Sequence, residues 1–204
     1  MSFANGQPSP VTGHRSPRCA LRSLPLAVVI GLLLMAGDGL ARTGDIKRDP
    51  ADLVKKYVSL DMKGARLEAI SWVTLKPYVN WKDEPVWGHT VVIRDVEVVD
   101  DVSRWQVVGA LEVVIPVKFR VLGSMYWETA SFVPHPELED VGFRVKAVAG
   151  RWRIIEPMAP PHVGHKRMIN YVRQALLDET DEAHRAQLAS LWEALRKAES
   201  GMGK

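Results

Sequence analysis

Apolar and polar residues recur along this chain with two periods, first that of helices and then that of strands. Between residues 53 and 67 apolar side chains recur every three or four positions, which predicts an amphipathic helix. Asp49 can accept the free amides at its start, and Pro50 fits the first helical position. A shorter helix is expected over residues 71–79, weakened by Pro77.

Strand-like alternation dominates the middle of the chain. Residues 90–99 predict a first strand. The odd positions from Trp105 to Val121 are then apolar or glycine over seventeen residues, which predicts one very long strand with a single buried face. Gly109 and Pro116 interrupt it, and both residues are usual at bends and bulges. We therefore expect this strand to bend strongly and wrap around something.

Further strands and side-chain preferences follow from the same pattern. Residues 126–133 predict another strand, and residues 143–148 and 151–155 predict a hairpin through Ala149-Gly150. On the long strand, Leu111 and Ile115 are expected to be buried, so that Asp at either position should abolish folding. Glu112, on the opposite face, should tolerate Lys.

The helical period returns after residue 161. One apolar stripe precedes Thr180, a predicted N-cap, and a second follows it. The two stripes comprise Met168, Tyr171, Val172 and Ala175, and then Leu188, Leu191, Trp192 and Leu195. We expect a helical hairpin over residues 162–204 that packs on the outside of the sheet or offers an apolar face to a partner.

The N-terminal residues 1–41 have the layout of a secretory signal peptide. Three arginines precede an apolar run over residues 24–37, and Gly39-Leu40-Ala41 matches the small-x-small pattern of a cleavage site. Fourteen apolar residues fall short of the ~20 that span a bilayer. We expect a periplasmic or secreted protein that touches the membrane only through its uncleaved signal peptide, with residues 42–48 as a linker.

Removal of that segment changes the charge and cysteine arguments. The whole chain carries a formal charge of +3, and residues 1–41 contain three Arg and one Asp, so +1 remains. No cluster of Lys and Arg with interleaved aromatics stands in the remaining sequence, which disfavours nucleic-acid binding. Cys19, the only cysteine, would be removed, and with it any disulfide, thiol nucleophile or Cys-based metal site.

The order of these elements carries a resemblance. The elements that carry the resemblance are an amphipathic helix with an internal Asp61, a short second helix, a long kinked strand and a final RWRI strand before prolines. The predicted architecture resembles that of the nuclear transport factor 2-like superfamily, which has ketosteroid isomerase-like and SnoaL-like members. The resemblance covers residues 49–161. It implies an α+β fold in which a curved antiparallel sheet wraps on the N-terminal helices as a cone, with a pocket at the open end. It also implies a homodimer paired through the outer sheet face.

The candidate pocket residues are Tyr57, Asp61, Tyr78, Trp81, Trp87 and His89. In the resembled fold, the stretch YVNWKDEPVWGHT lies near the mouth of the cone. Aromatic rings beside acids suit sugars and other half-apolar molecules, although tryptophans also hold a loop against a core, which we favour for Trp81 and Trp87. Asp61 lies on an apolar stripe and needs either a partner, for which Arg66 is a candidate, or a wet cavity.

Metal and cofactor sites are not predicted. His162 and His165 are spaced to share a helical face, but no acid accompanies them, and Lys166 and Arg167 would repel a cation. His135 lies between two prolines in an expected surface loop. No nucleophile elbow, phosphate loop, HExxH or paired catalytic carboxylates are found in the sequence.

Two functional hypotheses from different classes remain. The favoured one is an exported, non-catalytic domain that binds a small molecule or an envelope protein. The alternative is a small lyase or isomerase that uses Asp61 or His89 as general base, with Tyr57 or Tyr78 as hydrogen-bond donor. Convergence of Asp61, Tyr57 and His89 on one cavity would favour the enzyme, and a cone filled with apolar side chains would favour the binding domain.

The processing of the N-terminus is the first testable prediction. Because the basic region, the apolar run and the small-residue site occur in the right order, the exported protein should begin at or near Arg42. Mass spectrometry of the protein from the periplasm or medium checks this. An intact N-terminus in the membrane fraction would contradict it.

Overall fold

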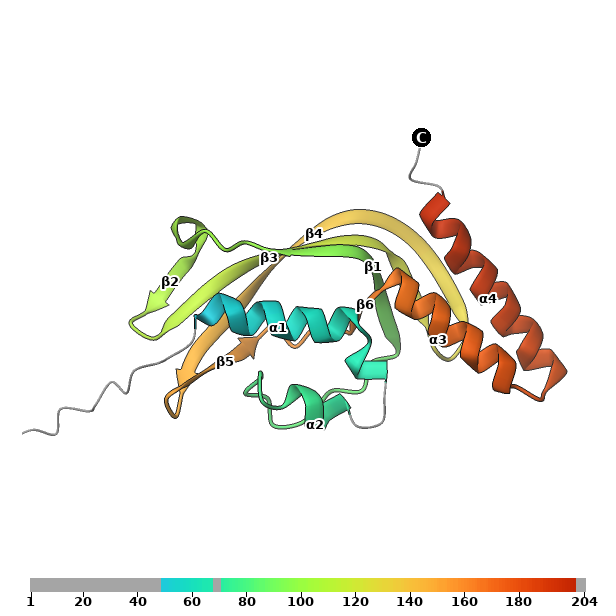
Figure 1. The fold of residues 1–204 in the computed structure, drawn as a ribbon, viewed down its shortest axis with the longest axis horizontal. Coiled ribbons are helices and arrows are strands. Elements are labelled where there is room, and N and C mark those ends of the chain that lie inside the picture. The colour runs from blue at the N-terminus through green and yellow to red at the C-terminus, as the bar shows by residue number, and fades with distance from the viewer. Residues whose placement is uncertain (1–48, 68–70, 201–204) are drawn as a thin grey trace, which may run out of the picture. The chain divides into compact units, whose positions relative to one another are not determined.

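A curled β-sheet folded over one helix organises the part of the chain that the computed structural model describes, residues 49–67 and 71–200 (Figure 1). These residues belong to one compact unit, Thr43–Lys204. The sheet has the strand order β5-β4-β3-β1-β6, with β2 paired to β3. Its strands are β1 (His89–Val98), β2 (Gln106–Gly109), β3 (Glu112–Tyr126), β4 (Ser131–Val148), β5 (Arg151–Glu156) and β6 (His162–Gly164).

The first helix starts as its sequence predicts. In α1 (Pro50–Met62) the Asp49 side chain accepts a 2.9 Å hydrogen bond from the Ala51 amide, as an N-cap should. The helix ends at Met62, and Gly64 follows the C-cap Lys63 with a φ of +80° that suits glycine and an amide that donates to the Asp61 carbonyl at 2.8 Å. A 3-10 turn, Ala65–Leu67, follows.

The second helix is shorter than expected. α2 (Ser71–Leu75) ends two residues before Pro77, whose ring disfavours helical backbone in the residue before it. The chain then pairs with the sheet, since Ile154 donates its amide to the Tyr78 carbonyl and Asn80 donates to Ile154, both at 2.8 Å. The segment after α2 is therefore fastened to β5.

The long strand expected over residues 105–121 is wrong, because the chain reverses within it. β2 ends at Gly109 and β3 begins at Glu112, and the two pair as an antiparallel hairpin. The expected burial is wrong for Leu111, which is 42% exposed at the turn, and is confirmed for Ile115, which is fully buried. Gly109 thus ends a strand and does not bend one.

Glu112 is also more constrained than its position on the even face suggests. Its carboxylate pairs with the Arg144 guanidinium and lies 3.1 Å from Lys146 Nζ. Hydrogen bonding by Lys146, supported by Arg144, holds the pKa of Glu112 below its usual value. Lys at this position would place three cations together, so we now expect Glu112→Lys to destabilise the sheet.

The next strands run further than the sequence indicates. A turn occupies residues 127–130, so residues 126–133 are not one strand, and β4 continues through Pro134 and Pro136 to Val148. Both prolines and His135 lie in the part of β4 that pairs only with β3. No strand lies on the other side of β4 here, so the missing N–H groups of the prolines cost no hydrogen bond on that side. The predicted hairpin between β4 and β5 is confirmed, with positive φ at Ala149 and Gly150.

The sheet curls where bulges line up across neighbouring strands. Register shifts follow Val92 and Ile93 in β1, and another lies between Val121 and Gly123 in β3, opposite them in the ladder. A Cβ atom on Gly123 would lie 2.3 Å from the Val133 carbonyl oxygen, so the backbones of β3 and β4 can approach here only at glycine. Figure 1 shows β1, β3 and β4 arching over α1.

The sheet is mixed, which corrects the expectation of an antiparallel one. β6 pairs in parallel with β1, with His162 opposite Val91 and Gly164 opposite Ile93. The first three residues of the expected helical extension are therefore the edge strand of the sheet. The chain enters α3 (His165–Asp178) directly from β6, and α4 (Glu182–Ser200) follows, capped by Asp181 and not by Thr180.

Two apolar cores lie on opposite faces of the curled sheet. Side chains alternate along β1, and Val91 and Ile93 belong to the core under α1, whereas Val92 belongs to the core under α3 and α4. The second core comprises Val92, Leu122, Met125, Val163, Met168, Val172, Leu188, Leu191 and Leu195. The C-terminal helical pair therefore packs against the outer face of the sheet. No helix among the described residues is long and apolar enough to cross a membrane.

A pair of identical substitutions tests the strand assignment. Ile115→Asp buries an unpaired carboxylate and should lower the free energy of unfolding by roughly 3–5 kcal/mol or prevent folding. Leu111→Asp, at the exposed hairpin turn, should change it by only about 0.5 kcal/mol. Urea unfolding of the two variants beside wild type measures both, and equal losses would contradict the β2–β3 hairpin.

Candidate functional site

The residues predicted to line one pocket lie in different surroundings. Tyr57, Asp61 and Trp81 are buried beneath the concave face of the sheet, and Tyr57 packs edge-on against Trp81 at 6.2 Å between ring centroids. Tyr78 packs against the same core. His89 lies at the start of β1 and stacks on Tyr126, 5.7 Å away. Asp61, Tyr57 and His89 therefore do not converge on one cavity.

Asp61 is held by a buried ion pair. Its two carboxylate oxygens accept hydrogen bonds from Arg66 Nε at 2.9 Å and Nη2 at 2.7 Å, and Oδ2 also accepts from the His162 amide at 2.9 Å. The Asp61 and Arg66 side chains are only 4% and 1% exposed. A carboxylate bound by a bidentate guanidinium and a backbone amide stabilises the fold. Its oxygen lone pairs are already occupied by these hydrogen bonds, whereas a general base needs a free lone pair to accept a proton from its substrate.

Arg66 also connects this ion pair to the segment before β6. Its Nη1 donates to the Ala159 carbonyl at 2.8 Å and its Nη2 donates to the Pro160 carbonyl at 2.9 Å. Burial disfavours the charged guanidinium, but the Asp61 carboxylate outweighs burial, and the pKa of Arg66 lies above its usual value. Burial raises the pKa of Tyr57, so this phenol keeps its proton and stays neutral.

His162 and His165, at the start of the C-terminal region, make contacts on opposite sides of β6. The His162 ring stacks against Phe119 at 4.3 Å and lies 3.5 Å from the Glu139 carboxylate on the concave side. Accordingly, hydrogen bonding to His162 lowers the pKa of Glu139. His165 Nε2 lies 2.7 Å from the Leu195 carbonyl oxygen and ties α3 to α4. Their spacing of three residues therefore does not bring the two rings together.

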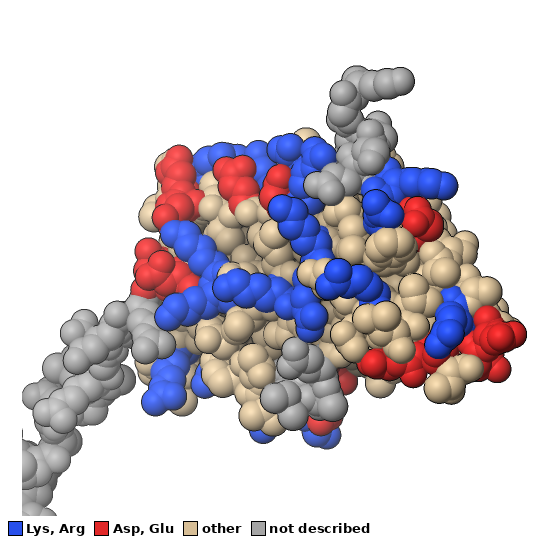
Figure 2. All heavy atoms as spheres, turned by 45° about the vertical axis from the view of Figure 1, so that its right-hand side comes forward, with Lys and Arg blue, Asp and Glu red and all other residues tan. Residues whose placement is uncertain are grey.

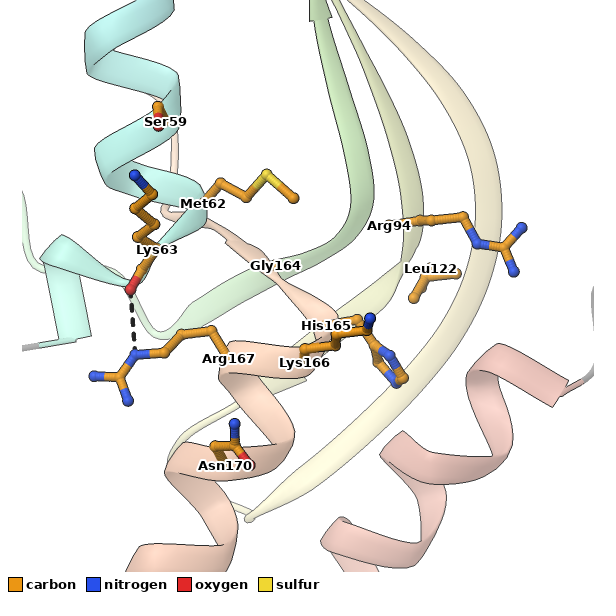
Figure 3. A pocket seen from close by; sticks show the side chains of 10 residues that line it. All are labelled: Ser59, Met62, Lys63, Arg94, Leu122, Gly164, His165, Lys166, Arg167 and Asn170. Carbon is orange, nitrogen blue, oxygen red and sulfur yellow. Dashed lines mark hydrogen bonds between the residues drawn. The ribbon is translucent and has the colours of Figure 1, made fainter.

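A different site lies between the end of α1 and the start of α3, and we call it the basic pocket (Figure 3). Its volume is about 520 Å³. Four cationic side chains line it, and among the described residues that line it there is no acid. The lining residues are Lys63, Arg94, Lys166 and Arg167, together with Ser59, Met62, Leu122, Gly164, His165 and Asn170.

Three cations of the basic pocket differ from several others in the protein in having no acidic partner within the described residues. Lys55, Arg120, Arg144, Lys146 and Arg196 pair with carboxylates. Within residues 49–67 and 71–200, the side chains of Lys63, Arg94 and Lys166 make no ion pair or hydrogen bond. Like charges gathered without counter-charges give a positive potential that favours an anion.

The start of α3 adds to this potential. Its N-cap is Gly164, which has no side chain to cap the helix, and the first turn contains no acid. The N-terminus of a 14-residue helix carries a partial positive charge from its aligned peptide dipoles. Figure 2 shows Lys and Arg gathered across the middle of one face of the molecule, with Asp and Glu towards the margins of that face.

Sequence reasoning missed this site for a clear reason. Lys63, Arg94 and the pair Lys166-Arg167 are far apart in the chain, so no basic cluster is visible in the sequence. The one local signal was Lys166-Arg167 directly after His165, which we used only to argue against a bound metal. The curled sheet and the packing of α3 bring the three segments together.

Comparisons with known proteins add no identification. No protein-family model, curated protein or solved structure matches the chain. The likeness to the nuclear transport factor 2-like superfamily thus remains one of predicted architecture, and the function has to be argued from the site itself.

The role of Asp61 can be tested by a near-isosteric change. Asp61→Asn leaves the buried Arg66 guanidinium uncompensated and should lower the free energy of unfolding by about 3–5 kcal/mol. The same change at Asp95, whose ion pair with Arg120 is half-exposed, should cost about 0.5 kcal/mol or less. Chemical denaturation measures both variants. Equal stability of the two would show that the Asp61–Arg66 pair does not fasten the fold.

Proposed function

We propose that this protein is an exported, non-catalytic domain that binds a small anionic molecule in the basic pocket. The observation that carries the proposal is a pocket lined by four cations and no acid, three of whose cationic side chains have no partner within the described residues. Carboxylate and phosphate groups are the anions that such side chains bind.

The size and chemistry of the pocket support a small ligand. Cavities of about 300–1,000 Å³ hold small molecules, and the basic pocket lies within that range. Its lining combines charged groups with the apolar side chains of Met62 and Leu122 and with the polar Ser59 and Asn170. Such a mixture allows charge to attract the ligand and polar groups to orient it.

The lyase or isomerase alternative finds no support in the arrangement of its residues. Its candidate base Asp61 is engaged by Arg66 and the His162 amide. The interior beneath the sheet is filled by apolar side chains such as Phe119 and Phe143. A binding role requires only that the ligand be held, and the basic pocket offers that without a positioned acid or base.

Isothermal titration with inorganic phosphate and with citrate tests the proposal. Binding should weaken as salt is raised from about 0.02 to 0.3 M, because screening shortens the reach of exposed charges. The double variant Lys63→Gln/Lys166→Gln should bind citrate about tenfold more weakly than wild type, as two lost charge contacts imply. Melting curves of the variants establish that they are folded.

Matched variants outside the pocket provide the control. Lys82→Gln/Arg151→Gln removes two exposed cations that do not line the basic pocket, so the net charge changes equally. This control should bind citrate as wild type does. If both double variants lose the same affinity, or if wild type binds neither anion, the basic pocket is not an anion site.

A further inference from the structure

The walls of the basic pocket continue into a second cavity, which we call the aromatic cavity. Its volume is about 360 Å³. Trp87 from the loop before β1, Trp127 from the β3–β4 turn and Tyr171 from α3 supply aromatic rings to it. The Trp127 and Tyr171 rings meet edge-on at 5.8 Å. Three separate segments of the chain thus bring aromatic surface to one place.

Both walls pass from one cavity to the other in the same order. Along the first wall, Lys63 lines the basic pocket, and Leu67, four residues later, lines the aromatic cavity. Along α3, Arg167 lines the basic pocket, and Tyr171, four residues later, lines the aromatic cavity. Arg167 and Tyr171 stand four apart on α3 and are neighbours on one face of that helix at about 6 Å, so the cavities adjoin along α3 within the length of a small molecule.

Arg167 spans the two walls where the cavities meet. Its Nε donates to the Lys63 carbonyl at 3.2 Å, as Figure 3 shows, and its guanidinium carbon lies 6.0 Å from the centre of the Tyr171 ring. Gly64 makes this crossing possible, since a Cβ there would lie only 3.0 Å from Arg167 Cγ and from Leu67 Cδ1. The Arg167 and Leu67 side chains therefore both lie close to the glycine.

From this continuity we infer that the two cavities form one binding groove, and that the anionic ligand of the basic pocket carries a flat apolar ring that lies in the aromatic cavity. The inference rests on the proposed anion-binding function and specifies its ligand class. The anionic group lies among Lys63, Lys166 and the start of α3. The ring lies against Trp127 and Tyr171, with Arg167 between the two parts.

The charges of the two ends set this orientation. Arg66 also lines the aromatic cavity, but its charge is matched by Asp61, and Glu84 lines the same cavity. Lys63, Arg94 and Lys166 lie at the basic end, so a carboxylate or phosphate is attracted to that end. Aromatic side chains stack on flat apolar rings through dispersion and through the polarity of their π-systems.

Three related probes test the inference by isothermal titration with the full chain. Naphthylacetate carries both parts of the inferred ligand, acetate carries only the anion, and naphthylacetamide carries only the ring. Naphthylacetate should bind wild type about tenfold or more tightly than either of the others, as one good aromatic contact and one charge contact imply.

Single substitutions assign the two parts to the two ends. Tyr171→Leu should reduce naphthylacetate affinity towards that of acetate and leave acetate binding unchanged. Lys166→Gln should weaken acetate and naphthylacetate by the same factor. Tyr126→Leu is the matched control, because Tyr126 is an exposed tyrosine beside Trp127 that does not line either cavity, and it should bind all three probes as wild type does.

The outcomes separate this inference from the proposed function. If naphthylacetate and acetate bind wild type equally while the phosphate and citrate results hold, the basic pocket binds anions and the shared groove is wrong. Equal losses in Tyr171→Leu and Tyr126→Leu would also overturn the groove. If Lys63→Gln/Lys166→Gln keeps its citrate affinity, the proposed function falls first and the groove with it.

Discussion

The buried ion pair between Asp61 and Arg66 is the interaction on which the rest of this structure depends. It joins the end of α1 to the chain just before β6, through the Ala159 and Pro160 carbonyls and the His162 amide. Transferring two charged groups from water to the protein interior has an unfavourable desolvation free energy. Here it is offset because each partner makes several hydrogen bonds. The pair therefore fixes where β6 adds to the sheet, and β6 in turn fixes where α3 begins.

The curl of the sheet is the second constraint, and it explains why both faces are covered. Bulges at the same level of β1 and β3 bend the sheet, and Gly123 allows β4 to follow closely. The inner face closes on α1, while the outer face of the bent region exposes Val92, Leu122 and Met125 to α3 and α4. The C-terminal helices thus bury the apolar side chains on the outer face of the sheet, and their packing sets the position of α3 beside α1.

The binding groove follows from these two constraints. Because β6 is an edge strand, the end of α1 and the start of α3 come together with no further strand between them. The meeting of a helix end with a helix start leaves space, and the side chains there are cationic at one end and aromatic at the other. The interior beneath the concave face of the sheet, by contrast, is filled by a core that includes Tyr57 and Trp81. The proposed ligand site therefore lies outside this interior, where the resemblance to known folds did not direct attention.

The sequence by itself determined the features that depend on neighbouring residues. Asp49 and Pro50 start α1 by local capping, the φ-tolerant turn Ala149-Gly150 makes the β4–β5 hairpin, and residues 90–99 match β1 within one residue. It also indicated that Asp61, on an apolar stripe, needs either a partner or a wet cavity. These signals are readable because capping, turns and periodicity act over a few residues.

Only the tertiary structure decided the rest, for physical reasons. A register shift between Val107 and Gly109 pairs Val107 with Val113, so odd positions lie opposite odd positions and the alternation runs through the turn as it would along one straight strand. Asp61 finds Arg66 because the chain reverses at Gly64, and it finds the His162 amide 101 residues away because β6 joins the sheet. The basic pocket likewise gathers Lys63, Arg94 and Lys166 through contacts between distant segments. Charge and aromatic clusters of that kind have no period in the sequence, since they exist only once the sheet has curled and α3 has packed on it.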